Sequence, residues 1–342
     1  MAVSGGVDSA VAALLLRQQG YQVHGLFIKM TGSSREMAAL DSAEKLSKAL
    51  DMPLHSVDMQ DTFKKEVIEY FFRTYESGLT PNPCVICNPS VKLKAAINTA
   101  DRLGINRIAT GHYARVRCTG RGKHFLLKAL DEKKDQSYFL HRVGPKVLER
   151  LLLPLGGLTR QAVEKMAKER GLEGMVQKES QDICFLAGDY KLHLERYTEN
   201  RDRPGPISTT DGRLVGRHLG LSRYTIGQRR GLGIPDKTPY YVVRIDPSSN
   251  TLVIGKKEEL FQAECQVCDL HWFVDASKII SSTVLVKLRS RHKPVRARIK
   301  PVSNADGRVI VYFREPQRAI TPGQFAVFYR KSLVLGGGVI CR

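Results

Sequence analysis

The run Ser4-Gly5-Gly6-Val7-Asp8-Ser9 combines residue types that hold a phosphate group where a strand turns into a helix. Three apolar residues precede it, and small and apolar residues from Ala10 to Leu16 predict a buried helix ending at Gly20. Two glycines let the backbone approach an anion, the N–H groups of the first helical turn point at it, and two serine hydroxyls add donors. The run therefore predicts a pyrophosphate cradle for ATP.

Two features limit this interpretation. The chain contains no G-x-x-x-x-G-K-S/T motif, so we do not expect phosphoryl transfer by a P-loop kinase or GTPase. A central strand has about 5–6 residues, which is more than the segment before the turn supplies. We therefore expect either a truncated first strand or a misassigned start.

Cys84 and Cys87 form the first of two C-x-x-C pairs. The dipeptide Asn88-Pro89 is typical of a helix start, so Cys87 is predicted to lie immediately before a helix N-terminus. The positive end of that helix, with nearby Lys92 and Lys94, would favour the thiolate, which is the form that acts as a nucleophile or a metal ligand. The alternative is a buried structural cysteine.

Cys265 and Cys268, with His271 close behind, resemble half of a zinc site. We disfavour this interpretation, because side chains three residues apart on a strand point to opposite faces. Cys118 and Cys341 show no partner pattern. The chain is expected to be cytoplasmic, where its thiols stay reduced.

The elements that must position these residues change character along the chain. Residues up to about 190 alternate strands and helices, which predicts a parallel α/β sheet. Its expected strands are 23–29, 54–58 and 108–110, and its expected helices are 37–50, 62–75, 89–103 and 160–170. His112 follows the strand 108–110, so it should face the same crevice as the glycine turn. Later residues predict a hairpin at 240–254 and, from about 265, a small closed or nearly closed β-barrel.

Composition supports a cytoplasmic protein that binds a polyanion. The 342 residues can bury more than one core, and no apolar run is long enough to span a bilayer. No signal peptide is evident. A net charge of +20 favours nucleic acid as a partner, and we find no long basic amphipathic helix for a membrane surface.

Several further segments, in the same order along the chain, carry a resemblance to a known family. They are Thr80-Pro81-Asn82-Pro83-Cys84-Val85-Ile86-Cys87-Asn88, Gly111-His112-Tyr113, Lys134-Asp135-Gln136-Ser137-Tyr138-Phe139-Leu140, Ser180-Gln181-Asp182-Ile183-Cys184-Phe185, Thr225 to Gly233 and Thr321-Pro322-Gly323-Gln324. Together with the glycine turn, which resembles the signature of the PP-loop ATP pyrophosphatases, they are similar to the tRNA-specific 2-thiouridylases over nearly the whole chain.

The resemblance implies a PP-loop domain with the adenine nucleotide α-hydrolase-like fold at residues 1–192. A central β-rich tRNA-binding domain at 193–263 and a C-terminal β-barrel at 264–342 would follow. It implies that ATP, with Mg²⁺ on its phosphates, adenylates the C2 oxygen of the wobble uridine, and that a persulfide then supplies sulfur. The sulfur would come from a cysteine desulfurase or a sulfur-relay protein. The sequence does not identify which tRNAs are recognised, and a monomer on tRNA is the default expectation.

By position in the motifs, the resemblance also assigns residue roles. Cys184 would carry the persulfide, and Cys87 would release the sulfur by attacking it or by closing a disulfide with Cys184. The residues assigned to ATP are Ala2, Val3, Ser4, Gly5, Gly6, Val7, Asp8, Ser9, Ile28 and Gly111. Those assigned to tRNA or its target base are Asn82, Pro83, Cys84, His112, Lys134, Asp135, Gln136, Arg289, Ser290 and Gln324.

One residue departs from the family's commonest pattern. Cys84 stands where most members carry an aspartate proposed to act as acid or base, so that role is in doubt. Cys84, Cys87 and Cys184 together could ligate a 4Fe-4S cluster with one open iron, as in related thiolases. The cluster route is therefore an alternative mechanism.

Two other classes of function remain. A PP-loop ligase acting on a small molecule would share the adenylation step but would need neither cysteine. A nonenzymatic RNA-binding protein would account for the basic charge and the β-barrel without any turnover of ATP.

Overall fold

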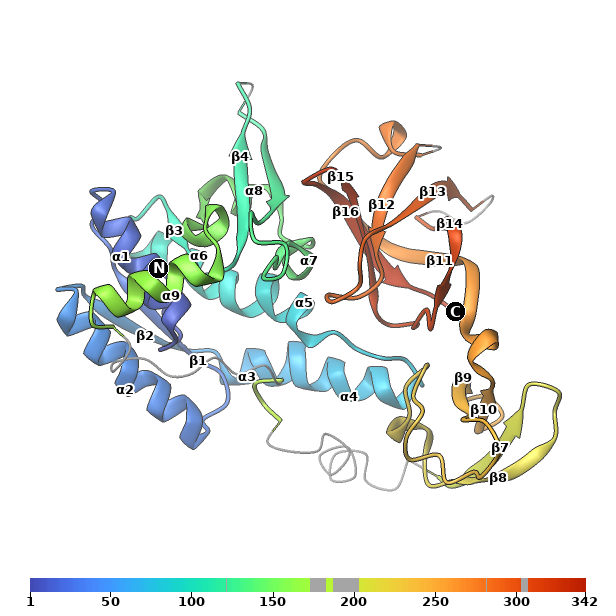
Figure 1. Cartoon of the computed structure of the whole chain (residues 1–342). Coiled ribbons are helices and arrows are strands. Elements are labelled where there is room, and N and C mark those ends of the chain that lie inside the picture. The colour runs from blue at the N-terminus through green and yellow to red at the C-terminus, as the bar shows by residue number, and fades with distance from the viewer. Residues whose placement is uncertain (121, 173–182, 187–202, 281, 303–306) are drawn as a thin grey trace. The chain divides into compact units, whose positions relative to one another are not determined.

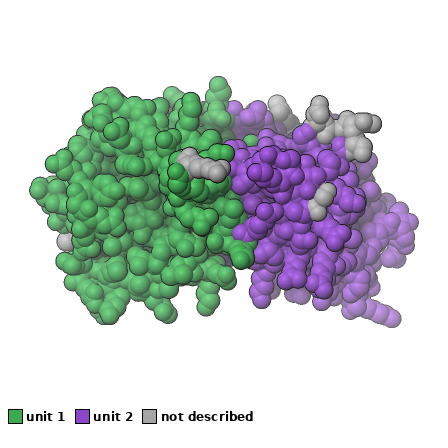
Figure 2. Space-filling model, turned by 90° about the horizontal axis from the view of Figure 1, so that it is seen from above, with its two compact units in different colours: residues 1–67, 84–185, 331–334 green, residues 68–83, 186–330, 335–342 purple. Residues whose placement is uncertain are grey.

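The structure is a computed structural model that describes residues 1–120, 122–172, 183–186, 203–280, 282–302 and 307–342 (Figure 1). The chain divides into two compact units that alternate along the sequence (Figure 2). Unit 1 comprises Met1–Val67, Cys84–Phe185 and Lys331–Val334, and unit 2 comprises Ile68–Pro83, Leu186–Arg330 and Leu335–Arg342. The limits of three domains given above remain a prediction.

Unit 1 contains a parallel sheet centred on Met1–Val3. Its strands are β1 (Gly25–Lys29), β2 (Leu54–Asp58), β3 (Ile108–Ala109) and β6 (Leu151–Leu152), with β1 paired to β2 and β3 to β6. The Val3 N–H donates to the Leu26 carbonyl and the Ala2 N–H to the Ala109 carbonyl, both at 2.9 Å. The short first segment therefore lies between β1 and β3, as the parallel α/β prediction requires. An antiparallel hairpin of β4 (Ala114–Cys118) and β5 (His124–Lys128) follows β3.

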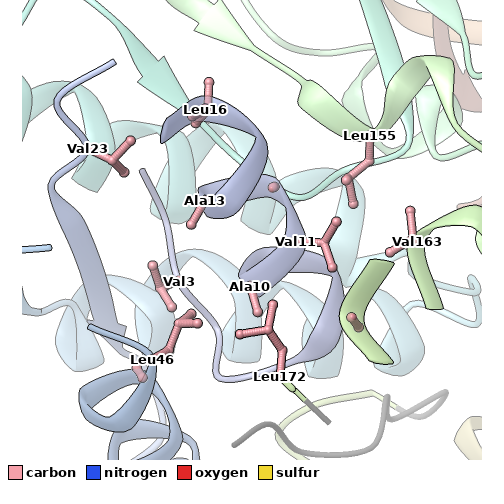
Figure 3. Packing of buried hydrophobic residues seen from close by; sticks show 14 of the residues in the cluster. Val3, Ala10, Val11, Ala13, Leu16, Val23, Leu46, Leu155, Val163 and Leu172 are labelled. Carbon is pink, nitrogen blue, oxygen red and sulfur yellow. The ribbon is translucent and has the colours of Figure 1, made fainter. Parts of the chain in front are cut away.

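Helices cover this sheet. They are α1 (Val7–Gln18), α2 (Ser34–Ala49), α3 (Gln60–Phe63), the π-helix η1 (Lys64–Ile68), α7 (Ser137–Leu140), α8 (Pro145–Arg150), the 3₁₀-helix η3 (Pro154–Gly157) and α9 (Arg160–Glu169). Helix α1 is buried on opposite sides, with Val3 and Leu46 on one side and Leu155 and Val163 on the other (Figure 3). Alanines fill the positions between, which lets neighbouring elements approach α1 closely and fixes the turn at its start.

The helix predicted to begin at Pro89 begins earlier. Three consecutive helical segments, α5 (Pro83–Cys87), the π-helix η2 (Asn88–Leu93) and α6 (Lys94–Arg102), run without a break. Proline lacks the N–H that an α-helix needs in its interior, and a π-helical stretch is one way in which a helix accommodates that loss. Asn88 is therefore not a helix cap: it lies inside the helix, and its Nδ2 donates to the Phe139 carbonyl at 3.1 Å.

Unit 2 begins with α4 (Glu69–Glu76) and contains a four-stranded sheet and a closed barrel. The sheet has the order β8 (Leu214–His218), β7 (Gly205–Thr209), β10 (Thr251–Gly255) and β9 (Tyr241–Asp246), with the 3₁₀-helices η5 (Leu221–Arg223) and η6 (Lys257–Leu260) beside it in the sequence. The barrel strands are β11 (Phe261–Trp272), β12 (Thr283–Lys287), β13 (Val295–Pro301), β14 (Val309–Arg318), β15 (Phe325–Arg330) and β16 (Leu333–Ile340), with the short helix η7 (Ala276–Lys278) after β11. Pairing of β11 with β16 closes the barrel, so the predicted hairpin and barrel are confirmed.

The expectation that every thiol stays reduced is wrong for one pair. Cys268 on β11 forms a disulfide with Cys341, directly after β16. The sequence offered no partner for Cys341 because the two residues meet only when the antiparallel strands β11 and β16 pair, Cys268 lying opposite Val339. Cys268 is therefore not available as a zinc ligand beside Cys265.

Among the described residues, no helix is long and apolar enough to cross a membrane.

Reduction of the disulfide should destabilise the barrel. The bond closes a loop of 73 residues, for which chain entropy predicts at most about 4 kcal/mol of stabilisation. Dithiothreitol should therefore lower the thermal unfolding midpoint of the air-oxidised wild-type protein. Cys341→Ser should unfold at the lower midpoint with or without dithiothreitol, whereas Cys118→Ser should respond as the wild type does. An unchanged midpoint on reduction would show that the bond contributes nothing.

Candidate active site

A cavity of about 410 Å³ in unit 1 brings most of the predicted ATP residues together. The glycine turn, the end of β1 with the loop after it, and Gly111-His112 after β3 form its walls. Side chains from η2 and from the segment around Cys184 also line it. The predicted residues in its lining are Ala2, Val3, Ser4, Gly6, Val7, Asp8, Ser9, Ile28, Gly111, His112, Gln136 and Cys184. A single hollow at the carboxyl ends of parallel strands thus contains the anion-binding turn and a thiol.

The turn itself leaves backbone N–H groups for an anion. Gly6 precedes α1 in an extended conformation, and no side chain caps the helix start. The Ser9 hydroxyl donates to the Gly6 carbonyl at 2.9 Å and accepts from the Ser4 N–H at 3.2 Å, which holds the turn in shape. The first N–H groups of a 12-residue helix therefore face the cavity without intrahelical partners.

Asp8 supports the turn and is not an open ligand. Its carboxylate accepts from the Tyr113 hydroxyl at 2.8 Å and forms an ion pair with Arg160 at the start of α9. Burial, and then the neighbouring Asp8 carboxylate, raise the pKa of Tyr113, so Tyr113 stays protonated and donates. Arg160 was not predicted, because nothing in the sequence relates a residue 152 positions away to the turn.

Glu36 on α2 shapes the opposite wall of the cavity and was also not predicted. Its carboxylate accepts from the backbone N–H groups of Met30 at 2.6 Å and Gly32 at 2.8 Å, and also from Thr31. These hydrogen bonds hold the loop that follows β1, the strand that contains Ile28. Ser33 caps α2 by accepting from the Glu36 N–H, so the pattern of a serine with a glutamate three residues later was a visible signal.

His112 is uncharged at neutral pH. Burial, and then the positive charge of Lys92, lower its pKa from 6.5 to about 3. The ring Nδ1 lies 2.8 Å from the Thr110 hydroxyl, which orients the imidazole. His112 can thus exchange hydrogen bonds in the cavity without adding charge.

The structure brings Cys84, Cys87 and Cys184 near one another and near Lys92, since the charge of each cysteine acts on the lysine. The prediction that a helix N-terminus ionises Cys87 is wrong. Cys87 ends α5, one turn into the helix, and it is buried, and desolvation raises the pKa of its thiol to about 12 in spite of Lys92. Burial also raises the pKa of Cys184, although part of that side chain is exposed.

These thiols do not form a metal site in the part of the chain that is described. No three His, Cys, Asp or Glu side chains there are placed so that they could hold one metal ion. Cys84 and Cys184 are exposed, whereas Cys87 is buried. The arrangement therefore does not fit a 4Fe-4S cluster held by the three cysteines.

Of the residues predicted to touch tRNA, Asp135 and Gln136 are engaged with neighbouring chain. The Asp135 carboxylate accepts from the Ala129 N–H and from Ser137, which shapes the loop before α7. The Gln136 Oε1 accepts from the Tyr113 N–H at 2.8 Å while its side chain lines the cavity. Lys134 lies in the same loop.

Asn82 and Gln324, predicted from separate motifs, meet in unit 2. The Asn82 Nδ2 donates to the Gln324 Oε1 at 3.5 Å, and the Gln324 Nε2 donates to the Pro81 carbonyl at 3.0 Å. Pro83 follows in the same unit, and Arg289 and Ser290 lie in the turn after β12. Two residues 242 positions apart in the sequence therefore form one polar contact.

The parallel sheet, with an anion-accommodating turn at the carboxyl end of its central segment, defines a HUP-type α/β domain. The family model described as "tRNA methyl transferase HUP domain" matches residues 1–188. Those described as "tRNA methyl transferase PRC-barrel domain" and "Aminomethyltransferase beta-barrel domain" match residues 191–256 and 262–340.

Relatives extend the similarity to the full chain. The tRNA-specific 2-thiouridylase MnmA of Chloroflexus aurantiacus is 44% identical over 100% of this chain and 98% of its own. That of Desulfotalea psychrophila is 40% identical over 99% of this chain and 98% of its own. The chain belongs to the tRNA-specific 2-thiouridylase family of enzymes, which confirms the family and the fold class predicted from its motifs.

A solved structure, the U34-tRNA thiolase NcsA from Methanococcus maripaludis with its 4Fe-4S cluster, also matches part of the chain. The match covers 58% of this chain and 64% of that one, at 17% identity and a TM-score of 0.37.

Gly5→Ala should damage the turn by more than backbone strain alone. Gly5 has φ +73°, and a Cβ there would lie 2.5 Å from the Ala39 carbonyl oxygen of α2. Gly20→Ala is the matched control, since Gly20 has φ +85° and open space around it. The control should cost about 1–2 kcal/mol of unfolding free energy, and Gly5→Ala clearly more, as measured by urea denaturation. Equal costs would show that α2 yields to the methyl group.

His112 should make the protein less stable as the pH falls. The unfolded chain takes up a proton near pH 6.5, whereas the folded chain does so only near pH 3, so the unfolded state binds more protons between these values. Unfolding free energy should therefore fall more steeply from pH 7 to 4 in the wild type than in His112→Gln. An NMR titration showing His112 protonated at pH 6 would contradict this.

Proposed function

We propose that this chain thiolates the C2 position of the wobble uridine of tRNA, using ATP to activate the C2 oxygen and a persulfide on Cys184 to replace it. The observation that carries the proposal is that the glycine turn and Cys184 line the same cavity. Activation of an oxygen by adenylation and its replacement by sulfur need both groups within reach of one base. The full-length relatives named tRNA-specific 2-thiouridylase support the substrate.

In the first step, the uridine C2 oxygen attacks the α-phosphorus of ATP and pyrophosphate leaves. The N–H groups at the start of α1 would stabilise the phosphates, and Gly111 and Ile28 would lie beside the nucleoside. Mg²⁺ would enter with the phosphates. The two cavity carboxylates, Asp8 and Glu36, are already bonded to protein groups, so we assign no step to the metal.

In the second step, the terminal sulfur of the Cys184 persulfide attacks C2 and AMP leaves with the former C2 oxygen. The Cys87 thiol, losing its proton, then attacks the Cys184 sulfur. A Cys87–Cys184 disulfide forms, and the outer sulfur stays on the base as 2-thiouridine. An external reductant must reduce the disulfide before the next turnover. The raised pKa of Cys87 protects it from reaction until a base removes its proton.

The description of the family model mentions a methyl transferase, but Cys87 and Cys184 favour sulfur transfer over methyl transfer. A methyl transferase would need neither a pyrophosphate cradle nor a thiol in the cavity. The cluster mechanism on Cys84, Cys87 and Cys184 is disfavoured, because the three thiols are not placed to hold one metal group among the described residues. The small-molecule ligase is weaker still, because it explains neither Cys87 nor Cys184.

For the tRNA, we propose contacts through His112, Lys134 and Gln136 in unit 1, and through Asn82 and Gln324 in unit 2. Pro83, Cys84, Asp135, Arg289 and Ser290 complete the proposed set. The net charge of +20 would attract the phosphate backbone. A cysteine desulfurase or a relay protein is the proposed sulfur donor.

The test is mass spectrometry of nucleosides from unmodified tRNA incubated with ATP, a cysteine desulfurase, cysteine and anaerobically purified protein. Wild type should form 2-thiouridine. Cys184→Ala should form none, Cys87→Ala should lose at least about tenfold in rate because sulfur release stalls, and Cys84→Ala should retain activity. Cys118→Ala is the control, since Cys118 is exposed on β4 and does not line the cavity.

Two results would redirect the assignment. Equal loss in Cys84→Ala and Cys184→Ala, with bound iron and sulfide in the active protein, would replace the persulfide with the cluster. No thiolation by the wild type would remove the proposed function, and it would favour the ligase if the protein also turned over ATP without tRNA.

A further inference from the structure

Lys92 is a half-buried cation in the cavity that the steps above do not use. It lines the cavity together with the glycine turn and Cys184. Among the described residues, its ammonium group has no hydrogen bond or ion pair with a carboxylate. Burial opposes the charged form of Lys92, but the charges that Cys87, Cys84 and Cys184 would carry as thiolates outweigh it and raise the pKa of Lys92, so the lysine is protonated at neutral pH.

The π-helix explains why Lys92 reaches the cavity. Lys92 follows Cys87 by five residues. In an α-helix, the residue one turn above Cys87 would be Val91, whereas the i→i+5 hydrogen bonding of a π-helix brings position 92 onto the face of Cys87. Here Val91 is fully buried in the core. The widened turn at Asn88–Leu93 thus places an ammonium group beside the thiols.

The groups around Lys92 do not supply a lasting negative charge at neutral pH. Cys87 is protonated, with a pKa of about 12, and the pKa of Cys184 is raised as well. His112 is neutral. A buried charge without a counterion is costly, so a ligand that brings an anion into the cavity gains by pairing with it.

The other cations of the cavity are less suited to this task. Arg160 is already paired with Asp8 and Glu164. Arg35 lines the cavity but is exposed, so solvent screens its charge. Of these three cations, Lys92 therefore gains most from an ion pair with a bound anion.

We propose that the Lys92 ammonium group binds a phosphate oxygen of the nucleotide, opposite the N–H groups of the glycine turn. It would then also stabilise the AMP that leaves when sulfur attacks. This inference rests on the proposed use of ATP and adds to it a named phosphate-binding residue on η2.

The test compares two ligands that differ only in the phosphate. Binding of AMP and of adenosine to the full-length protein is measured by calorimetry, without tRNA, for the wild type, Lys92→Met and Lys92→Arg. Loss of a charge-assisted hydrogen bond should weaken AMP about ten- to hundredfold in Lys92→Met. Adenosine affinity should not change, and Lys92→Arg should restore most of the AMP affinity. Lys94→Met is the matched control, because Lys94 is exposed two residues later and does not line the cavity.

The outcomes separate this inference from the proposed function. Equal weakening of AMP and adenosine in Lys92→Met would mean that the lysine only maintains the shape of the cavity, and the inference would be wrong while the proposed function stands. Unchanged AMP affinity in Lys92→Met would overturn the inference in the same way. If the wild type binds neither ATP nor AMP, the proposed function itself fails, and Lys92 has no phosphate to bind.

Discussion

The site depends on two places where backbone meets backbone with no side chain between. Gly5 lies against the Ala39 carbonyl of α2, and a Cβ on Gly111 would lie 3.1 Å from the backbone of Asp8 and Ser9. These contacts hold the turn between α2 and the end of β3, so the N–H groups at the start of α1 have one fixed direction. Preorganised donors of this kind need no rearrangement when an anion binds. The carboxylate of Asp8, tied to Tyr113 and Arg160, fixes the same turn from the other side.

Burial determines the electrostatics of the cavity. Desolvation makes His112 neutral and favours the protonated thiols of Cys87 and Cys184, so groups that would titrate near neutral pH in water carry little charge here. The helix start that would have ionised Cys87 lies one turn earlier in the chain, at Pro83. Thiol chemistry in this cavity therefore depends on what enters it, because a bound phosphate or base changes the field that each sulfur experiences.

The sequence alone was enough to predict the parallel sheet, the hairpin, the barrel and most residues of the cavity, because these follow from local patterns and from motifs of contiguous residues. The sequence alone did not predict features that depend on a contact between residues far apart in the chain. Arg160 reaches Asp8 across 152 positions, and the Cys268–Cys341 pair depends on the register of β11 against β16. The Asn88-Pro89 pair misled because a proline inside a π-helical turn has the same local sequence as a helix start.

The alternation of the two units along the chain bears on how the protein is made. Unit 1 includes the segment Lys331–Val334, which contains the start of β16. There Leu333 pairs with Leu127 of β5, and the Lys128 N–H donates to the Ser332 carbonyl. A ribosome that has delivered the whole cavity, through Cys184, has therefore not yet delivered the strand that completes the β4–β5 edge of the same unit. Until residue 334 emerges, that edge exposes unpaired backbone groups to other chains. The nascent chain thus passes through a stage in which all residues that line the cavity are present and a sheet edge is open to wrong partners.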